Sequence, residues 1–193
     1  QGRGGFYDQT GTIRDVVQNH LFQVLCNLAM EPPVRADAET IRDEKVKMLK
    51  AMLPLAPENL VRGQFRGYRA EAGVKPESQV ETFAAMKLEI DSWRWRGVPF
   101  YIRAGKNLPV TCTEITVRLR QVPTMYRNFD LKPNHFRFRI SPEIVVTFGM
   151  NAMAASSESE AESVEMVFNR QLGQRDMDAY ERVLTDAMDG DAT

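Results

Sequence analysis

The sequence predicts an α+β fold in which helices pack on a large, mainly antiparallel sheet. Between residues 13 and 52, apolar side chains recur at intervals of three and four, which is the period of amphipathic helices. From residue 60 onward the pattern becomes alternating, and strand-like segments follow one another without helices between them. Because 193 residues suffice for one well-buried core, we expect a single domain over residues 1–193.

The first helix is expected over residues 13–30, after a glycine-rich loop at residues 1–12. Thr12 is the expected N-cap, because a hydroxyl there can accept a hydrogen bond from a free amide of the first turn. Pro32-Pro33 cannot continue a helix and should end it. A second helix is expected over residues 38–52, capped by Asp37.

The strands are predicted from alternation of apolar and polar residues. The longest alternating segment is 82–90, and a short strand at 99–104 leads directly into Gly105-Lys106. Further strands are expected at 61–68, 115–120, 136–140, 143–148 and 163–168, followed by a helix at 178–188. One face of the sheet should pack on the helices, while the other carries several arginines and is either solvated or in contact with a second subunit.

Composition excludes several classes of function. The net charge is −1, so the chain as a whole has no electrostatic basis for binding nucleic acid or an anionic membrane. No apolar stretch is long enough to cross a bilayer, and no signal peptide is visible. Cys26 and Cys112 lack the spacing of a metal site, which favours reduced structural thiols and no metal. A cytoplasmic protein is expected from these features.

The two histidines have different prospects. His135 begins a strand with no candidate base or metal ligand nearby, and is expected to be structural or at the surface. His20 follows Val17 by three residues, so on an α-helix it projects toward the apolar side. A buried, hydrogen-bonded histidine is one interpretation. The other is a general base, since imidazole titrates near neutral pH.

Asp15 and Lys106 are the other candidate site residues. Asp15 precedes His20 by five positions, which places the two side chains ~140° apart on an α-helix, where they can still flank one ligand. A first-turn carboxylate favoured by the helix dipole is the alternative interpretation. Lys106 follows a strand and suits a phosphate, whereas a plain surface lysine is the default interpretation of a Gly-Lys pair by itself.

A dinucleotide-binding loop is not found in the sequence. Gly2-Arg3-Gly4-Gly5 does not match G-x-G-x-x-G between a strand and a helix, and no cofactor-binding residue is assigned. No Ser/His/Asp nucleophile arrangement is present either.

An ordered set of motifs resembles the glucose-6-phosphate dehydrogenase family over nearly the whole chain. The most specific is Arg14-Asp15-Val16-Val17-Gln18-Asn19-His20. The others are Arg3-Gly4-Gly5-Phe6-Tyr7-Asp8, Met30-Glu31-Pro32, Ile41-Arg42-Asp43-Glu44-Lys45-Val46-Lys47, Glu81-Thr82-Phe83-Ala84-Ala85, Gly97-Val98-Pro99-Phe100, Arg103-Ala104-Gly105-Lys106 and Asp178-Ala179-Tyr180-Glu181-Arg182.

The resemblance implies the C-terminal, substrate-binding domain of an oxidoreductase. Such an enzyme oxidises glucose 6-phosphate to 6-phosphogluconolactone with hydride transfer to NADP, the first step of the pentose phosphate pathway. His20 matches the family's general base, Asp15 a carboxylate that binds sugar hydroxyls, and Lys106 a lysine of the substrate site. The implied fold is α+β on a large antiparallel sheet that also forms a homodimer or homotetramer contact.

Several motifs of the family do not occur in this sequence, and their absence decides what we expect of the chain. The family's coenzyme loop, its His-Tyr-x-x-Lys motif and the aspartate that orients the imidazole do not occur in this sequence, and the chain begins at Gln1. We therefore expect a fragment, without the N-terminal coenzyme-binding domain and inactive alone. Thr111 stands where some members of the family have a basic residue, so no role is assigned to it. Animal members of the family have basic residues at the positions of Cys112 and Thr116, where they bind a structural NADP. Their absence here favours an enzyme of the bacterial type. The alternative is a non-catalytic sugar-phosphate binding or dimerisation module of the same fold.

Overall fold

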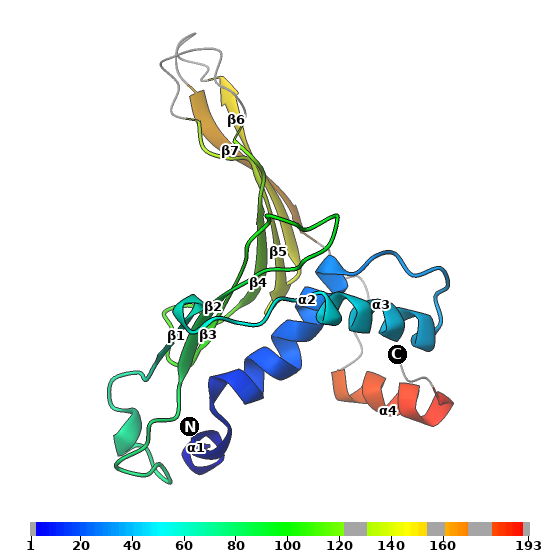
Figure 1. Cartoon of the computed structure of the whole chain (residues 1–193). Coiled ribbons are helices and arrows are strands. Elements are labelled where there is room, and N and C mark those ends of the chain that lie inside the picture. Colours follow the sequence, from blue (N-terminus) through cyan, green and yellow to red (C-terminus); the bar gives the residue numbers. More distant parts are fainter. Residues whose placement is uncertain (1–2, 122–130, 154–160, 170–178, 191–193) are drawn as a thin grey trace. The chain divides into compact units, whose positions relative to one another are not determined.

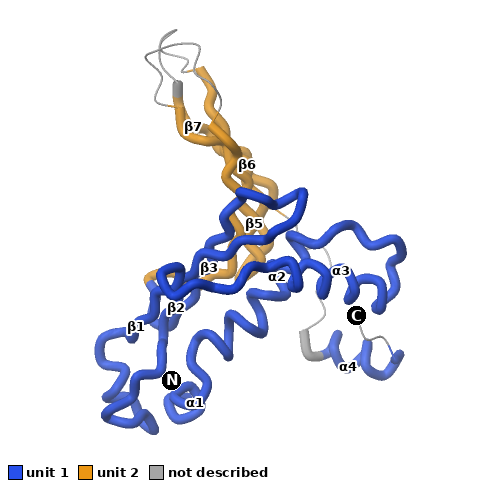
Figure 2. Tube along the Cα trace, viewed as in Figure 1, with its two compact units in different colours: residues 1–108, 178–193 blue, residues 109–177 orange. Residues whose placement is uncertain are grey.

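The computed structural model describes residues 3–121, 131–153, 161–169 and 179–190. The chain divides into two compact units, residues 1–108 with 178–193 and residues 109–177 (Figure 2). Among the described residues the strands form a three-stranded and a four-stranded sheet, both antiparallel (Figure 1). The predicted α+β class with antiparallel strands is therefore confirmed, whereas a single domain over residues 1–193 stays a prediction.

The first unit begins with three consecutive helical segments. They are α1 (Gly4–Thr12), the π-helix η1 (Ile13–Leu21) and α2 (Phe22–Ala29), and α3 (Ala38–Lys50) follows. Asp37 caps α3 as predicted, because its Oδ1 accepts a hydrogen bond of 2.9 Å from the Thr40 amide.

The sheet of the first unit consists of β1 (Leu60–Gly63), β2 (Phe83–Leu88) and β3 (Phe100–Gly105), with β2 in the centre. Short 3₁₀ turns, η2 (Pro57–Asn59) and η3 (Tyr68–Ala70), flank β1. The strand predicted over residues 61–68 is thus shorter than expected. The helix α4 (Ala179–Asp189) belongs to the same unit.

The prediction of a loop over residues 1–12 is wrong, because α1 occupies most of this segment. Its glycines are required by close packing. A Cβ on Gly4 would lie 2.4 Å from the carbonyl oxygen of Ala72. Gly11 has φ 70° and breaks the helix before η1. Tertiary contacts therefore override the poor helix propensity of glycine in this segment.

The core of the first unit lies between the helices and one face of the three-stranded sheet. In β2 the burial alternates strictly, as the sequence pattern predicts, and Ala84, Met86 and Leu88 point inward. The helices supply the opposing side chains, which are Val17, Leu25, Cys26, Ala29 and Met48. The predicted apolar stripe of the first helix is therefore the surface that packs on the sheet.

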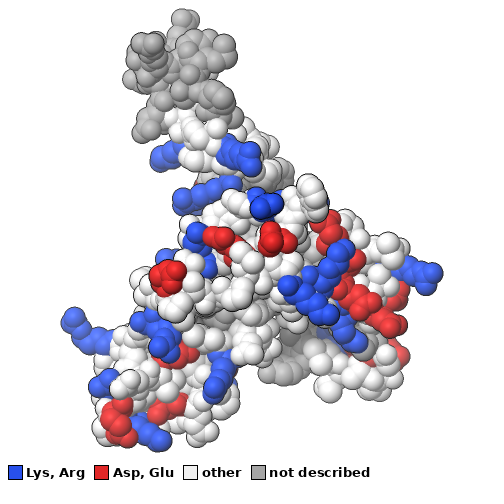
Figure 3. Space-filling view, viewed as in Figure 1, with Lys and Arg blue, Asp and Glu red and all other residues white. Residues whose placement is uncertain are grey.

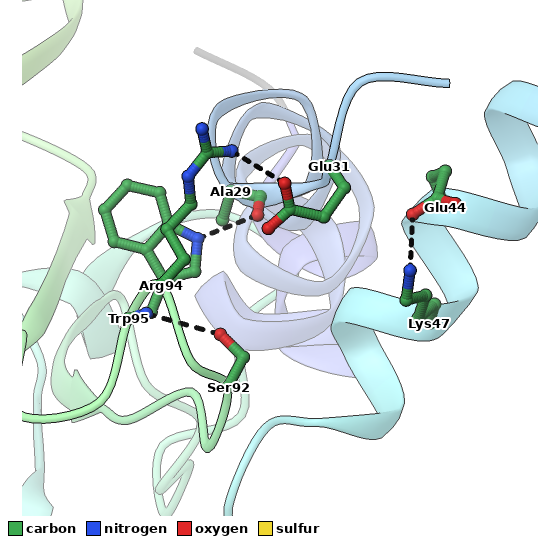
Figure 4. A network of polar contacts seen from close by, with 7 residues as sticks. All are labelled: Ala29, Glu31, Glu44, Lys47, Ser92, Arg94 and Trp95. Carbon is green, nitrogen blue, oxygen red and sulfur yellow. Dashed lines mark hydrogen bonds and ion pairs between the residues drawn. The ribbon is translucent and has the colours of Figure 1, made fainter. Parts of the chain in front are cut away.

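The C-terminal end of α2 is held by a polar network that Figure 4 shows from close by. The Trp95 indole Nε1 donates a 2.8 Å hydrogen bond to the carbonyl oxygen of Ala29, one of the carbonyls left free at a helix end. Arg94 pairs with Glu31 at 3.1 Å beside it. The Trp95 ring also packs edge-on against Phe100, with ring centroids 5.2 Å apart. These contacts tie the helical layer to the start of β3.

The second unit is an antiparallel sheet with one apolar and one polar face. Its strands are β4 (Thr113–Arg118), β5 (His135–Ser141), β6 (Val145–Met153) and β7 (Ala161–Asn169), paired in that order. On the polar face, His135 packs against Gly149, and its Nε2 lies 3.5 Å from the Oε1 of Glu165, contacts that favour the structural alternative of its prediction. The apolar face carries Phe136 stacked on Phe148, with centroids 4.6 Å apart.

Two further expectations can be compared with the structure. Cys26 is buried, as expected of a structural thiol, whereas Cys112 is exposed, and neither forms a disulfide among the described residues. None of the described helices combines the length and apolar character that a membrane-spanning segment needs. In the lower part of Figure 3 basic and acidic side chains are interspersed, whereas the upper part of the visible face carries basic ones.

Replacing Trp95 by Phe is expected to lower the free energy of unfolding by about 1 kcal/mol, because the Ala29 carbonyl loses its donor while the ring packing is retained. Urea unfolding followed by circular dichroism measures this change. Trp93→Phe is the matched control, since Trp93 is fully exposed and its replacement should change the free energy by less than about 0.5 kcal/mol. Equal effects of the two substitutions would contradict this role of the indole.

Candidate active site

Asp15 and Lys106 lie together although they are far apart in the sequence. Asp15 is in η1, Lys106 follows the last residue of β3, and the Asp15 Oδ2 and Lys106 Nζ atoms are 3.7 Å apart. The side chains are 23% and 46% exposed, respectively, so both are accessible to a ligand. The pair offers a carboxylate that can accept from hydroxyls next to an ammonium that can bind an anionic oxygen.

Tyr7 lies beneath Lys106 and completes this side of the site. The Lys106 Nζ is 5.0 Å from the centre of the Tyr7 ring, within the range of a cation–π interaction. The Tyr7 hydroxyl hydrogen-bonds to the buried Thr12 side chain, and burial raises the pKa of the Tyr7 phenol. Thr12 therefore does not cap a helix, contrary to the prediction, because its hydroxyl is engaged by Tyr7.

The π-helical geometry of η1 changes the expected relation between Asp15 and His20. The Phe22 amide donates to the carbonyl of Val17, five residues earlier. A backbone bonded from i to i+5 has more residues per turn than an α-helix, so two residues five positions apart are directed more nearly to one side, as for Asp15 and His20. On a regular α-helix they would be ~140° apart.

His20 is exposed, and the prediction that it projects toward the apolar side is wrong because that estimate assumed an α-helical period. Within the described part of the chain, the His20 side chain forms no hydrogen bond or ion pair. Its imidazole is thus accessible from solvent near the Asp15 side of η1. Sequence reasoning proposed Asp15, His20 and Lys106 as candidates but did not include Tyr7, whose position under Lys106 depends on how α1 folds back.

Asp8 connects α1 to the segment between β1 and β2. Its carboxylate accepts hydrogen bonds from the Ser78 hydroxyl, from the Tyr68 hydroxyl at 3.1 Å and from the Lys75 amide at 3.3 Å. The Ser78 bond contributes most to lowering the pKa of Asp8. On the other side of this network, burial and hydrogen bonding to Asp8 raise the pKa of Tyr68 to about 12. This cluster holds α1, and therefore Tyr7, in place.

The glycine-rich segment at the start of the chain does not fit a coenzyme. A Cβ on Gly4 or Gly5 would meet the backbone of Ala72 or Gly73, so the close approach that glycine allows is made by another part of the same chain. A pyrophosphate therefore has no free access to these backbone amides. Among the described residues no group of three or more His, Cys, Asp and Glu side chains is placed to hold a metal ion.

An apolar pocket of about 200 Å³ lies on another side of η1. It is lined by Ile13, Val17 and Phe22 together with side chains from β2 and from residues 52–55. Asp15, His20 and Lys106 do not line it, and Gln18 is its only polar lining residue. A sugar phosphate is thus better matched by the Asp15–Lys106 surface than by this pocket.

Comparison with known proteins supports the resemblance seen in the sequence. The family model for the glucose-6-phosphate dehydrogenase C-terminal domain matches residues 1–193, and the chain belongs to this family. A glucose-6-phosphate 1-dehydrogenase of Aggregatibacter actinomycetemcomitans is 42% identical over 207 residues, covering 99% of this chain and 42% of that protein. The cytoplasmic isoform of glucose-6-phosphate 1-dehydrogenase from Solanum tuberosum is 41% identical over 197 residues, covering 99% of this chain and 38% of that protein.

Solved structures show the same likeness. The glucose-6-phosphate 1-dehydrogenase of Mycobacterium avium aligns with a TM-score of 0.88 at 42% identity, covering 99% of this chain and 41% of that one. A glucose-6-phosphate dehydrogenase in complex with glucose-6-phosphate gives a TM-score of 0.88 at 38% identity, over 99% of this chain and 42% of that one. The chain thus spans about two fifths of the length of these relatives.

The raised pKa of Tyr68 predicts a loss of stability at alkaline pH. The folded pKa of about 12 exceeds the unfolded value of 10.0, so the contribution of Tyr68 is complete below pH 10 and is lost as the pH rises toward 12. The difference in free energy of unfolding between the wild type and Tyr68→Phe should therefore shrink between pH of about 9 and about 11.5. Urea unfolding at both pH values measures it. A difference that stays constant would contradict the shift.

Proposed function

We propose that this chain is the substrate-binding domain of a glucose-6-phosphate dehydrogenase, an oxidoreductase that converts glucose 6-phosphate to 6-phosphogluconolactone with NADP as hydride acceptor. The observation that carries the proposal is the Asp15–Lys106 pair, 3.7 Å apart, with Tyr7 beneath it and His20 on the same helix. Family membership supports it, as does the relative whose structure contains glucose-6-phosphate.

Each side chain has a distinct role in the proposal. Lys106 supplies a positive charge for an oxygen of the sugar phosphate, and Asp15 accepts hydrogen bonds from sugar hydroxyls. His20 is the general base: it takes the proton of the C1 hydroxyl while a hydride leaves C1, so that the C1–O bond becomes the lactone carbonyl. The exposure of His20 leaves its imidazole accessible to this hydroxyl.

The glycine-rich segment is not the site of the hydride acceptor in this proposal, because Gly4 and Gly5 pack against the chain's own backbone. We infer that NADP binds mainly in a separate coenzyme domain of a longer protein. The 193-residue chain alone then binds substrate without oxidising it. A cytoplasmic location is proposed from the name of the potato relative.

Titration calorimetry with glucose 6-phosphate tests the proposal. Lys106→Met is expected to weaken binding about tenfold or more, because a charged hydrogen-bond donor to the ligand is removed. Asp15→Asn should also weaken binding, by loss of a charged acceptor. Lys87→Met is the matched control: Lys87 lies in the same sheet and pairs with Glu89 at 2.8 Å, so its loss should not alter affinity.

Two outcomes would overturn this proposal. No heat of binding from the wild-type chain, or equal affinity of Lys106→Met and Lys87→Met, would contradict the assigned substrate site.

The chain mixed with glucose 6-phosphate and NADP is expected to form no NADPH. Formation of NADPH by the purified chain would contradict the inference that the coenzyme domain is separate.

We further propose that copies of the chain associate as a homodimer or homotetramer through the four-stranded sheet. Its apolar face consists of two cross-strand rows, Ile115–Phe138–Val146–Phe168 and Val117–Phe136–Phe148–Met166. Phe168 remains 56% exposed and Met166 49% exposed. An apolar sheet face of this kind is unfavourable in water unless another surface covers it, and a second copy of the same face is self-complementary under twofold symmetry.

Analytical ultracentrifugation of two adjacent substitutions tests the association. Phe168 and Val167 lie next to each other on β7, are each 56% exposed and point to opposite faces of the sheet. Phe168→Asp should shift the chain toward monomer, because it places a charge in the contact. Val167→Asp, on the polar face, should leave the sedimentation unchanged. A monomeric wild type, or equal effects of both substitutions, would contradict the proposed contact.

A further inference from the structure

Glu81, the residue before Thr82 and β2, binds the N-terminal end of η1 with both its backbone and its side chain. Its carbonyl oxygen accepts a 3.0 Å hydrogen bond from the Thr12 amide, and its Oε1 accepts one of 3.0 Å from the Ile13 amide. The first amides of a helix have no acceptor within the helix. A carboxylate at this position also interacts favourably with the positive end of the helix dipole. Glu81 therefore does what the sequence assigned to Thr12.

Gly11 makes this approach possible. It has φ 70°, and a Cβ at this position would lie 2.5 Å from the Oε1 atom of Glu81. Any other residue at position 11 would be strained and would also displace the carboxylate. The contact between Glu81 and the N-terminal end of η1 thus depends on the backbone conformation of Gly11 as well as on the position of Glu81.

The residue next to Glu81 supports the other half of the site. The carbonyl of Thr82 accepts a 2.8 Å hydrogen bond from the Lys106 amide. Thr82 is itself fully buried, and its amide and hydroxyl bind Gly63 and Phe65. Two consecutive residues, Glu81 and Thr82, therefore hold the backbone that precedes Asp15 and the backbone that carries Lys106.

We propose that Glu81 is a positioning residue of the substrate site: by capping η1 it sets Asp15 opposite Lys106. The inference rests on the proposed function, since it assigns Glu81 a part in binding glucose 6-phosphate. Glu81 acts through the Thr12 and Ile13 amides and not through the ligand. Without its carboxylate, the Ile13 amide would be left without an acceptor in a partly buried position, and the first turn of η1 would lose its anchor.

Three variants of the 193-residue chain test this role. Glu81→Ala removes the side-chain acceptor and is expected to weaken glucose 6-phosphate binding about tenfold in titration calorimetry. Glu81→Gln keeps an oxygen that can accept from Ile13 and should retain most of the affinity. Asp37→Ala is the matched control, because Asp37 caps α3 in the same manner, away from the site, through Thr40. It should lower stability without changing affinity.

Two measurements without ligand separate positioning from mere stabilisation. Hydrogen exchange at the Ile13 amide should accelerate in Glu81→Ala and stay unchanged in Asp37→Ala. The Lys106 side chain lies over the Tyr7 ring, so its ε-methylene protons should show a ring-current NMR shift. That shift should diminish in Glu81→Ala and persist in Glu81→Gln. Gly11→Ala should reproduce Glu81→Ala in both measurements.

The outcomes distinguish the two proposals. If the wild type does not bind glucose 6-phosphate, the proposed function fails, and with it the part of Glu81 in substrate binding. If the wild type binds and Glu81→Ala binds equally well, the positioning role fails while the function stands. Faster exchange at Ile13 with an unchanged Lys106 shift would also overturn the positioning role, because Glu81 would then be only a helix cap.

Discussion

The packing of the first unit depends on the burial of one face of β2, which fixes the pairing register of this strand. Ala84, Met86 and Leu88 are almost completely buried against the helical layer, and they lie at every second position of the central strand. A slip of one residue in its pairing would turn all of these side chains toward solvent and the polar ones toward the core. The register with β3 is therefore fixed, with Phe83 opposite Gly105. This pairing places Lys106 beside Thr82, at the end of the sheet where η1 begins.

The Asp15–Lys106 pair that results suits reversible binding. Both side chains are partly exposed and their charged atoms are 3.7 Å apart, so their mutual attraction is weak in contact with water. A ligand that offers a hydroxyl to the carboxylate and an anionic oxygen to the ammonium can replace this contact at little cost. The Tyr7 ring beneath Lys106 limits the directions that the ammonium can take. The two charged groups are thus held near each other without a ligand, and prearrangement of this kind reduces the entropy that binding costs.

Local patterns predicted the elements whose causes are local. Asp37 precedes its helix directly and caps it, and the alternation around Met86 corresponds to one buried face. Family motifs proposed Asp15, His20 and Lys106 as site residues, and the structure brings the first and third together. Sequence patterns did not predict features that are caused by residues far away in the sequence. The cap of η1 comes from Glu81, which is 68 positions from Ile13 in sequence, and no local signal announces it.

The other wrong predictions also have causes that local sequence patterns do not contain. Residues 4–12 form a helix because Gly4 packs against Ala72, a contact that propensity does not contain. The orientation of His20 was misjudged because the estimate used the α-helical period, which does not hold in the π-helix η1. The division of the strands into a three-stranded and a four-stranded sheet, among the described residues, also depends on pairing that alternation alone does not specify.

The π-helix has a consequence for how this chain can change in length. A π segment is equivalent to an α-helix with one residue inserted. Deleting one residue between Asp15 and His20 would let η1 relax to the more stable α form and would gain backbone stability. Asp15 and His20 would then be four residues apart on an α-helix, where side chains differ by only about 40° in direction, so both would stay on the same side. The segment between these two residues is therefore the part of the helix where a one-residue deletion favours folding and still keeps the two side chains together. A deletion inside α3, which has no π segment to absorb it, would instead rotate all later residues of that helix by about 100°.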